Sequence, residues 1–140
     1  MKNTVFSLLL DTPDGVFTHS IQHNALLADD DPVSITLTFH LNGTPIIVEG
    51  DNTETAVRHL ANNLPNGYTI RSCFSCRHGN FCPTGDCDNE IFCTSDVEIP
   101  DKSSLFAITS SPEERAQRSR TLFDCCAQFS PLSDQFYTYK

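Results

Sequence analysis

The sequence predicts an α+β fold, in which antiparallel β-hairpins pack on a helix and a metal holds together a cysteine-rich C-terminal region with a final helix. Three observations support this prediction. Residues 33–41 alternate strictly between apolar and polar side chains, and residues 52–63 carry apolar side chains at helical spacing. Five of the seven cysteines lie between residues 73 and 93, a clustering that is typical of metal sites in a reducing compartment.

The first two expected strands form a hairpin. Residues 4–10 and residues 16–21 are two largely apolar runs. Between them, Thr12-Pro13-Asp14-Gly15 has Pro and Gly at the positions that a type I turn favours. Residues 28–32 contain three adjacent Asp and a Pro, so we expect a solvated loop there.

The second hairpin has the clearest local pattern. Residues 33–41 place their apolar side chains on one face of a strand and their polar side chains on the other. Asn42-Gly43 then supplies the two positive φ angles of a type I′ turn. Residues 46–48 are apolar again, which predicts the returning strand.

A helix is expected over residues 52–63. Asp51 stands three residues before Glu54, in the spacing of a capping box. Pro65 cannot continue the helical hydrogen-bond ladder, so the helix ends before it. Residues 68–72 then form a short strand that leads into the cysteines.

The final helix is expected over residues 112–129. Ser111 is its N-cap, with Pro at the first helical position. Cys126 would lie on the apolar face, one turn from Leu122. In contrast, residues 73–104 show little periodicity, so we expect a metal rather than an apolar stripe to order them.

Composition and charge restrict the class of protein. Of the 140 residues, 39% are apolar and 19% are charged, which fits a soluble globular domain. Eighteen Asp and Glu against nine Lys and Arg give a formal net charge of −9, and no basic run offers a footprint for phosphates. We therefore expect no nucleic-acid partner. The length predicts a single domain over 1–140, with a β-rich α+β core in 1–72 and a cysteine-rich metal-binding part in 73–129.

The expected compartment decides how the cysteines are interpreted. The apolar run near the N-terminus ends at Asp11 without a signal-peptide cleavage site, and no apolar stretch approaches the length of a membrane span. We therefore expect a cytoplasmic protein without a membrane partner. Disulfides are rare in the cytosol, and an odd number of cysteines leaves one thiol over in a scheme of disulfides alone. Metal binding is the favoured interpretation.

The predicted metal ligands are four cysteines. In Cys73-Phe-Ser-Cys76-Arg-His-Gly79, a Cys-x-x-Cys pair at a strand end points two sulfurs into one tetrahedral site, and the glycine lets the backbone turn back. This pair is half of a zinc site. We expect Cys93 and Cys126 to complete a structural Zn²⁺ site of four thiolates, which ties the loop and the last helix to the strand.

Several alternatives remain open at this point. Cys125 is the second choice for the fourth ligand, and either member of the Cys125-Cys126 pair could be a packing thiol only. The first pair could be redox-active, or the same thiolates could hold an iron–sulfur cluster. The reserve ligands, in a turn-rich segment, are Cys82, Cys87 and His78.

Two segments resemble a set of small, uncharacterised bacterial proteins classed as a domain of unknown function. They are IRSCFSCRHGNFCPTGDCDNEIFC, from Ile70 to Cys93, and Leu122-Phe123-Asp124-Cys125-Cys126-Ala-Gln-Phe129. The resemblance implies a bacterial protein with a β-rich N-terminal half. It also implies that Cys73, Cys76, Cys93 and one late cysteine are the shared ligands, and it implies nothing about a reaction.

The sequence favours a binding function over catalysis, with no catalytic residues predicted. It contains no P-loop, no dinucleotide-binding glycine motif, no His-Glu-x-x-His and no Gly-x-Ser-x-Gly. We expect a non-enzymatic, zinc-stabilised protein-interaction module, such as an immunity or regulatory factor. A basic protein is the expected partner, because Asp29-Asp30-Asp31 and the net negative charge would attract it. The alternative is a thiol oxidoreductase, or an iron–sulfur or other metal enzyme, that uses the cysteine cluster.

Overall fold

The computed structural model describes residues 1–85 and 87–140 and confirms the α+β class. The chain divides into two compact units, Met1–Ile70 and Arg71–Lys140, which we call unit 1 and unit 2. Each is described by itself.

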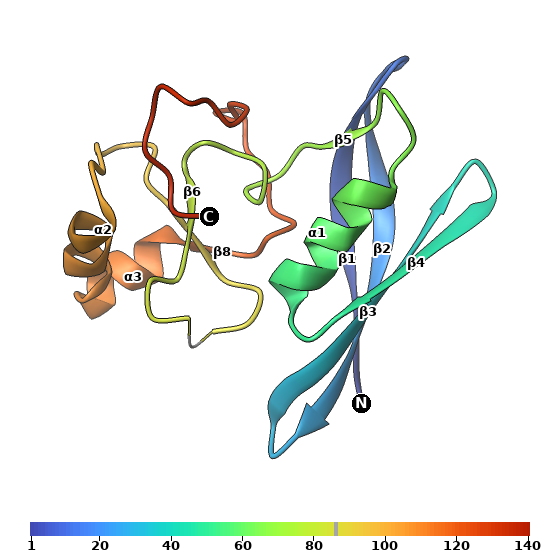
Figure 1. Cartoon of the computed structure of the whole chain (residues 1–140), viewed down its shortest axis with the longest axis horizontal. Helices are drawn as coiled ribbons and strands as arrows, with labels where there is room; N and C mark the ends of the chain where they lie inside the picture. The colour runs from blue at the N-terminus through green and yellow to red at the C-terminus, as the bar shows by residue number, and fades with distance from the viewer. Residues whose placement is uncertain (86) are drawn as a thin grey trace. The chain divides into compact units, whose positions relative to one another are not determined.

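Unit 1 is a five-stranded sheet with one helix (Figure 1). The strand order is β4-β3-β2-β1-β5, and every neighbouring pair is antiparallel. The predicted positive φ angles are present at Asn42 (52°) and Gly43 (79°), so the second hairpin is confirmed. The strands are β1 (Lys2–Thr12), β2 (Gly15–Ala28), β3 (Asp31–Leu41), β4 (Thr44–Gly50) and β5 (Thr69–Ile70).

The second strand is much longer than expected. It runs on past Ile21 to Ala28, and Asp29 and Asp30 alone make the turn into β3, both with positive φ. In the sequence, the apolar run stops at Ile21, because the next side chain of β2 that faces the core belongs to His23. His23 is 7% exposed, and its Nε2 lies 2.8 Å from Thr53 Oγ1. A buried polar pair thus continues the strand beyond the apolar run that ends at Ile21.

The helix α1 (Thr53–Asn63) packs on β3 and β4 and covers one face of the sheet (Figure 1). Its N-cap is Asn52, whose side chain accepts from the N–H of Thr55 at 2.8 Å, so the capping role expected for Asp51 is wrong. The largest fully buried side chains of unit 1 are Phe39, Leu8, Leu10, Ile21, Ile35, Leu37, Leu60 and Val57.

Unit 2 contains a three-stranded antiparallel sheet in the order β6-β7-β8 and two short helices (Figure 1). Its strands have only two or three residues each, and its core includes Phe92, Ile91, Leu105 and Leu122. The elements are β6 (Gly79–Phe81), β7 (Ile91–Cys93), α2 (Lys102–Thr109), α3 (Pro112–Arg118) and β8 (Ser119–Arg120). The sequence predicted neither α2 nor these strands.

The last helix begins as predicted but ends early. Ser111 is the N-cap and accepts from the N–H of Glu114. Helix α3 ends at Arg118 instead of reaching Phe129, because the next two residues pair with β7 as strand β8. The prediction of a helix over 119–129 is therefore wrong. Tertiary strand pairing overrides the local helical pattern here.

Candidate metal centre

The chain from Cys73 to Gly79 forms a tight reversal. The N–H of Cys76 donates to the carbonyl of Cys73 at 3.3 Å, and the N–H of Gly79 donates to the carbonyl of Cys76 at 3.1 Å. A Cβ on Gly79 would lie 2.2 Å from the Cys73 carbonyl oxygen. Glycine is required at this position because any side chain would push the two backbone segments apart.

Cys93 lies directly beside this reversal. It is the last residue of β7 and is the cross-strand partner of Gly79 in the β6–β7 ladder. Its Sγ donates to Ser95 Oγ at 3.4 Å. The strand pairing thus brings a third cysteine to the Cys-x-x-Cys segment, while its role as a metal ligand stays a prediction.

The segment after β8 packs against the same reversal. The N–H of Cys73 donates to the carbonyl of Asp124 at 2.7 Å, and Cys76 forms a β-bridge with Pro131. These contacts fix both ends of the stretch that contains the two late cysteines. Long-range backbone pairing, not a helix, positions this stretch.

The late cysteines therefore have a different setting from the predicted one. Cys126 is exposed, and Cys125 is partly buried. The N–H of Phe129 donates to the carbonyl of Cys126 at 3.1 Å, which closes a turn. The expectation that Cys126 faces the core from a helix is wrong, because α3 ends before it.

A pocket of about 390 Å³ lies where these segments meet. Four of its lining residues are cysteines, and they come from three separate stretches of the chain. The lining residues are Cys73, Cys93, Ser95, Arg120, Asp124, Cys125, Cys126, Ala127 and Gln128. The pocket thus gathers three of the four predicted zinc ligands, together with the second choice for the fourth place.

The other three predicted ligands all influence the pKa of Cys73. Burial is the largest cause, and with the negative charges of Asp124, Cys76, Cys93 and Cys126 it raises the pKa of this thiol from 9.0 to about 12. Burial also raises the pKa of Cys125, against the opposing charge of Arg71. Ionising Cys73 without a compensating cation is therefore costly.

The thiols are neighbours without being assembled as ligands. Among residues 1–85 and 87–140, no three His, Cys, Asp or Glu side chains are arranged so that they could hold a metal ion as they stand. A tetrahedral thiolate site needs sulfurs about 2.3 Å from the metal. The cysteine side chains would have to turn into the pocket to bind it.

The reserve ligands lie outside the thiol pocket. Cys82 and Cys87 both accept hydrogen bonds from Arg115, and His78 lines a different pocket. Burial lowers the pKa of His78, and the positive charges of Arg77 and Lys140 lower it further. The structure thus separates these three residues from the predicted four.

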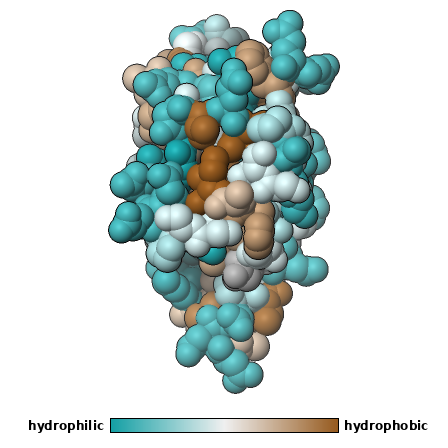
Figure 2. Space-filling model, turned by 90° about the vertical axis from the view of Figure 1, so that its left-hand side faces the viewer, coloured by the Kyte–Doolittle hydropathy of each residue, from teal (hydrophilic) through white to brown (hydrophobic). Residues whose placement is uncertain are grey.

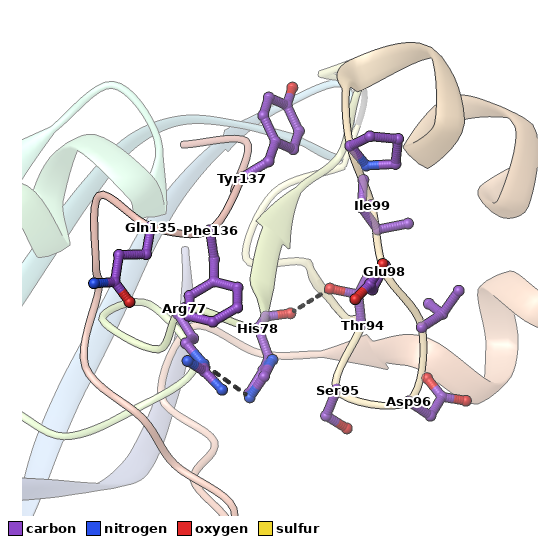
Figure 3. Close-up of a pocket in the computed structure, with 12 residues that line it drawn as sticks. Arg77, His78, Thr94, Ser95, Asp96, Glu98, Ile99, Gln135, Phe136 and Tyr137 are labelled. Carbon is purple, nitrogen blue, oxygen red and sulfur yellow. Dashed lines mark hydrogen bonds between the residues drawn. The ribbon is translucent and has the colours of Figure 1, made fainter.

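The second pocket, of about 900 Å³, adjoins the cysteine segments (Figure 3). Arg77 stacks its guanidinium 4.1 Å from the ring centre of Phe136 and donates from Nε to His78 Nε2 at 3.4 Å. Thr94 and the residues after it form another wall. The two walls directly follow Cys76 and Cys93 in the sequence.

The residues at the C-terminal end contribute contacts that the sequence did not predict. The carbonyl of Tyr139 accepts from the N–H of Phe81 at 2.9 Å, and Thr138 Oγ1 donates to the carbonyl of Gly79 at 2.9 Å. Lys140 Nζ donates to the carbonyls of Cys73 and Cys76. No spacing in the sequence indicated that this segment holds the Cys-x-x-Cys reversal in place.

Comparison with protein-family models, with curated proteins and with solved structures found no match. The resemblance to small bacterial proteins with a Cys-x-x-Cys pattern therefore stays a prediction. No helix among the described residues has the length and apolar character needed to cross a membrane.

Proposed function

We propose that this protein is a non-enzymatic protein-interaction module in which one structural Zn²⁺, bound by four thiolates, orders unit 2. The ligands are Cys73, Cys76, Cys93 and Cys126. The observation that carries the proposal is the setting of Cys73, whose thiol lies within electrostatic range of the other three. Four thiolates from separate segments match the donor set of structural zinc sites.

The chemistry of the donors fits zinc. A cation would neutralise the thiolate charges that oppose one another in the metal-free pocket, and it would replace the protons on buried sulfur. The lining of the thiol pocket also includes Asp124, Ser95 and Arg120. A site closed by four sulfurs has no open position for substrate, which supports a structural role rather than a catalytic one.

The small elements of unit 2 explain why a metal is useful there. Its strands have two or three residues, and its helices have eight and seven. Such elements bury little apolar surface, so much of their order must come from other interactions. Zinc would join the Cys-x-x-Cys reversal, the end of β7 and the segment after β8.

The binding part of the proposal rests on charge. Residues 1–70 contain eight Asp and Glu but only two Lys and Arg. Asp29 and Asp30 are exposed at the β2–β3 turn, and Asp31 begins β3. Four thiolates and one Zn²⁺ would add two more negative charges to the formal −9. This acidity favours a protein partner with a basic surface and disfavours nucleic acid.

Cysteine substitutions test the zinc site. We expect Cys73→Ser and Cys93→Ser to lose zinc and to unfold unit 2, because the binding free energy of the metal is also folding free energy. Cys125→Ser and Cys82→Ser are matched controls that should keep one zinc. Metal content and the thermal unfolding of each variant are measured together. If Cys73→Ser kept both its zinc and its melting temperature, the proposal would be wrong.

A further inference from the structure

We propose that Cys82 and Cys87 form a second, separate thiol site, which reacts with hydroperoxides and closes to a reversible disulfide. The zinc proposal uses neither residue. A single arginine contacts both sulfurs, and the two thiols differ in exposure.

The backbone turns back on itself directly after Cys82, over residues 82–85. Cys82 follows β6 directly, and the N–H of Gly85 donates to its carbonyl at 3.0 Å. Pro83 is at the second turn position, which its fixed φ favours, and Gly85 has a φ of 68°.

Arg115 contacts both sulfurs through a single nitrogen. Its Nη2 donates to Cys87 Sγ at 3.1 Å and to Cys82 Sγ at 3.8 Å. Because both distances start from the same atom, the two sulfurs can be no further apart than the sum of these distances. The shared nitrogen therefore makes the two thiols neighbours, and a disulfide between them requires their sulfurs to approach to about 2.05 Å.

The guanidinium of Arg115 is fixed in this position by its own partners. Glu90 Oε1 accepts from Nη2 at 3.0 Å, and Ser119 Oγ donates to Glu90 Oε2 at 2.8 Å. The guanidinium carbon also lies 5.4 Å from the centre of the Phe92 ring. A hydrogen bond from an arginine stabilises a thiolate, which is the nucleophilic form of cysteine.

The two thiols differ in access, which assigns their roles. Cys87 is exposed, whereas Cys82 is only 6% exposed. Cys87 is therefore the thiol that meets the peroxide, and Cys82 is the resolving thiol. Cys82 also lines a pocket of about 260 Å³ with Phe106, Pro112 and Arg115. Figure 2 shows apolar side chains gathered between hydrophilic ones on the side of unit 2 that carries α2 and α3.

The proposed reaction has two steps. The Cys87 thiolate attacks one oxygen of the hydroperoxide, the O–O bond breaks, and the leaving oxygen takes a proton to give water or an alcohol. Sulfur is thereby oxidised to sulfenic acid while the peroxide is reduced by two electrons. Cys82 then attacks this sulfur, the S–S bond forms, and the hydroxyl leaves as water with the proton of Cys82. A small dithiol reverses the change by thiol–disulfide exchange.

The test uses the full-length reduced protein and one equivalent of hydrogen peroxide, followed by alkylation and peptide mapping by mass spectrometry. We expect one disulfide, between Cys82 and Cys87, which dithiothreitol reverses. Cys82→Ser should stop at a Cys87 sulfenic acid that dimedone labels. Cys125→Ser is the control and should still form the disulfide at the same rate.

The role of Arg115 is tested by Arg115→Gln, with Arg58→Gln in α1 as a control that removes one cation elsewhere. Arg115→Gln should slow the reaction by roughly tenfold, since a hydrogen bond to a charged group contributes at least that factor. Arg58→Gln should leave the rate unchanged. A first disulfide between other cysteines, or a rate that Arg115→Gln leaves unchanged, would overturn the proposal. Metal content is measured in parallel, so failure of the zinc site is distinguished from failure of this one.

Discussion

At the scale of single residues, Gly79 leaves no room for a side chain. A Cβ there would meet the Cys73 carbonyl oxygen at 2.2 Å and Ile91 Cδ1 at 2.9 Å. The side chain of Ile91 can move, but the carbonyl belongs to the backbone that carries the first cysteine. A substitution therefore acts directly on the geometry of the proposed metal centre.

Gly79→Ala should destabilise unit 2 by about 3 kcal/mol or more, because the added carbon forces a backbone shift. It should also lower the zinc content. Gly43→Ala is the control: Gly43 has a φ of 79° with nothing within 4 Å of its Cβ position, so it should cost only about 1–2 kcal/mol and keep the metal. Equal zinc content and similar melting temperatures for the two variants would contradict the role of Gly79.

The thiol of Cys73 makes the stability of the metal-free protein depend on pH. Its pKa is about 12 in the folded state, above the ordinary value of 9.0 that applies in the unfolded chain. Between these values the unfolded chain releases the proton and the folded chain keeps it, so rising pH favours unfolding. The contribution of this thiol is fully present below pH 9 and is lost as the pH rises toward 12.

We therefore expect the denaturant concentration at the unfolding midpoint of the metal-free protein to decrease as the pH is raised from about 9 to about 11. The decrease should be less steep in Cys73→Ala. The zinc-bound protein should show a different dependence, in which acid releases the metal because protons compete for the thiolates. Equal slopes for the metal-free protein and its Cys73→Ala variant would show that Cys73 does not carry the effect.

At the scale of elements, α1 depends on one capping side chain. Asn52 Oδ1 accepts from the N–H of Thr55, while the exposed Asp51 lies one residue outside the cap. Asn52→Ala should cost about 1 kcal/mol in the free energy of unfolding. Asp51→Ala should change it by less than about 0.5 kcal/mol. Chemical denaturation of both variants measures the difference, and the reverse order would restore the capping box expected from the sequence.

Long elements that are determined by neighbouring residues could be predicted from the sequence, whereas short elements that depend on distant contacts could not. The hairpin at Asn42-Gly43 and helix α1 could be predicted, because turn chemistry and apolar periodicity act over a few neighbouring residues. The elements of unit 2 could not, because strands such as β6 and β8 are too short to show periodicity. Their positions come from contacts between distant segments, such as the bridge between Cys76 and Pro131.

In the candidate site too, features set by local spacing could be predicted and features set by distant contacts could not. The Cys-x-x-Cys spacing predicted the reversal at Cys73, and the structure places Cys93 opposite Gly79. The helical setting of Cys126 was wrong because the pairing of β8 with β7 ends α3. The grouping of the cysteines could be predicted, whereas the path of the chain to the last of them could not.

At the scale of the whole molecule, the acidic β2–β3 turn gives a test of partner binding. Asp29 and Asp30 have φ angles of 52° and 67°, a conformation that Asn also tolerates. Replacing Asp29, Asp30 and Asp31 together with Asn therefore removes charge and keeps the turn. Against a partner recovered from native cells, association should slow by up to about tenfold at low salt, while dissociation changes little. An association rate that is insensitive to salt in the unmodified protein would contradict electrostatic attraction.

The metal content of the protein, purified without added metal, tests the central claim most directly. Elemental analysis and the visible spectrum are recorded on the same sample. We expect one zinc per chain, no colour, and a metal that leaves together with the fold of unit 2 when a chelator is added. A brown protein containing iron, or a fully folded protein containing no metal, would contradict it.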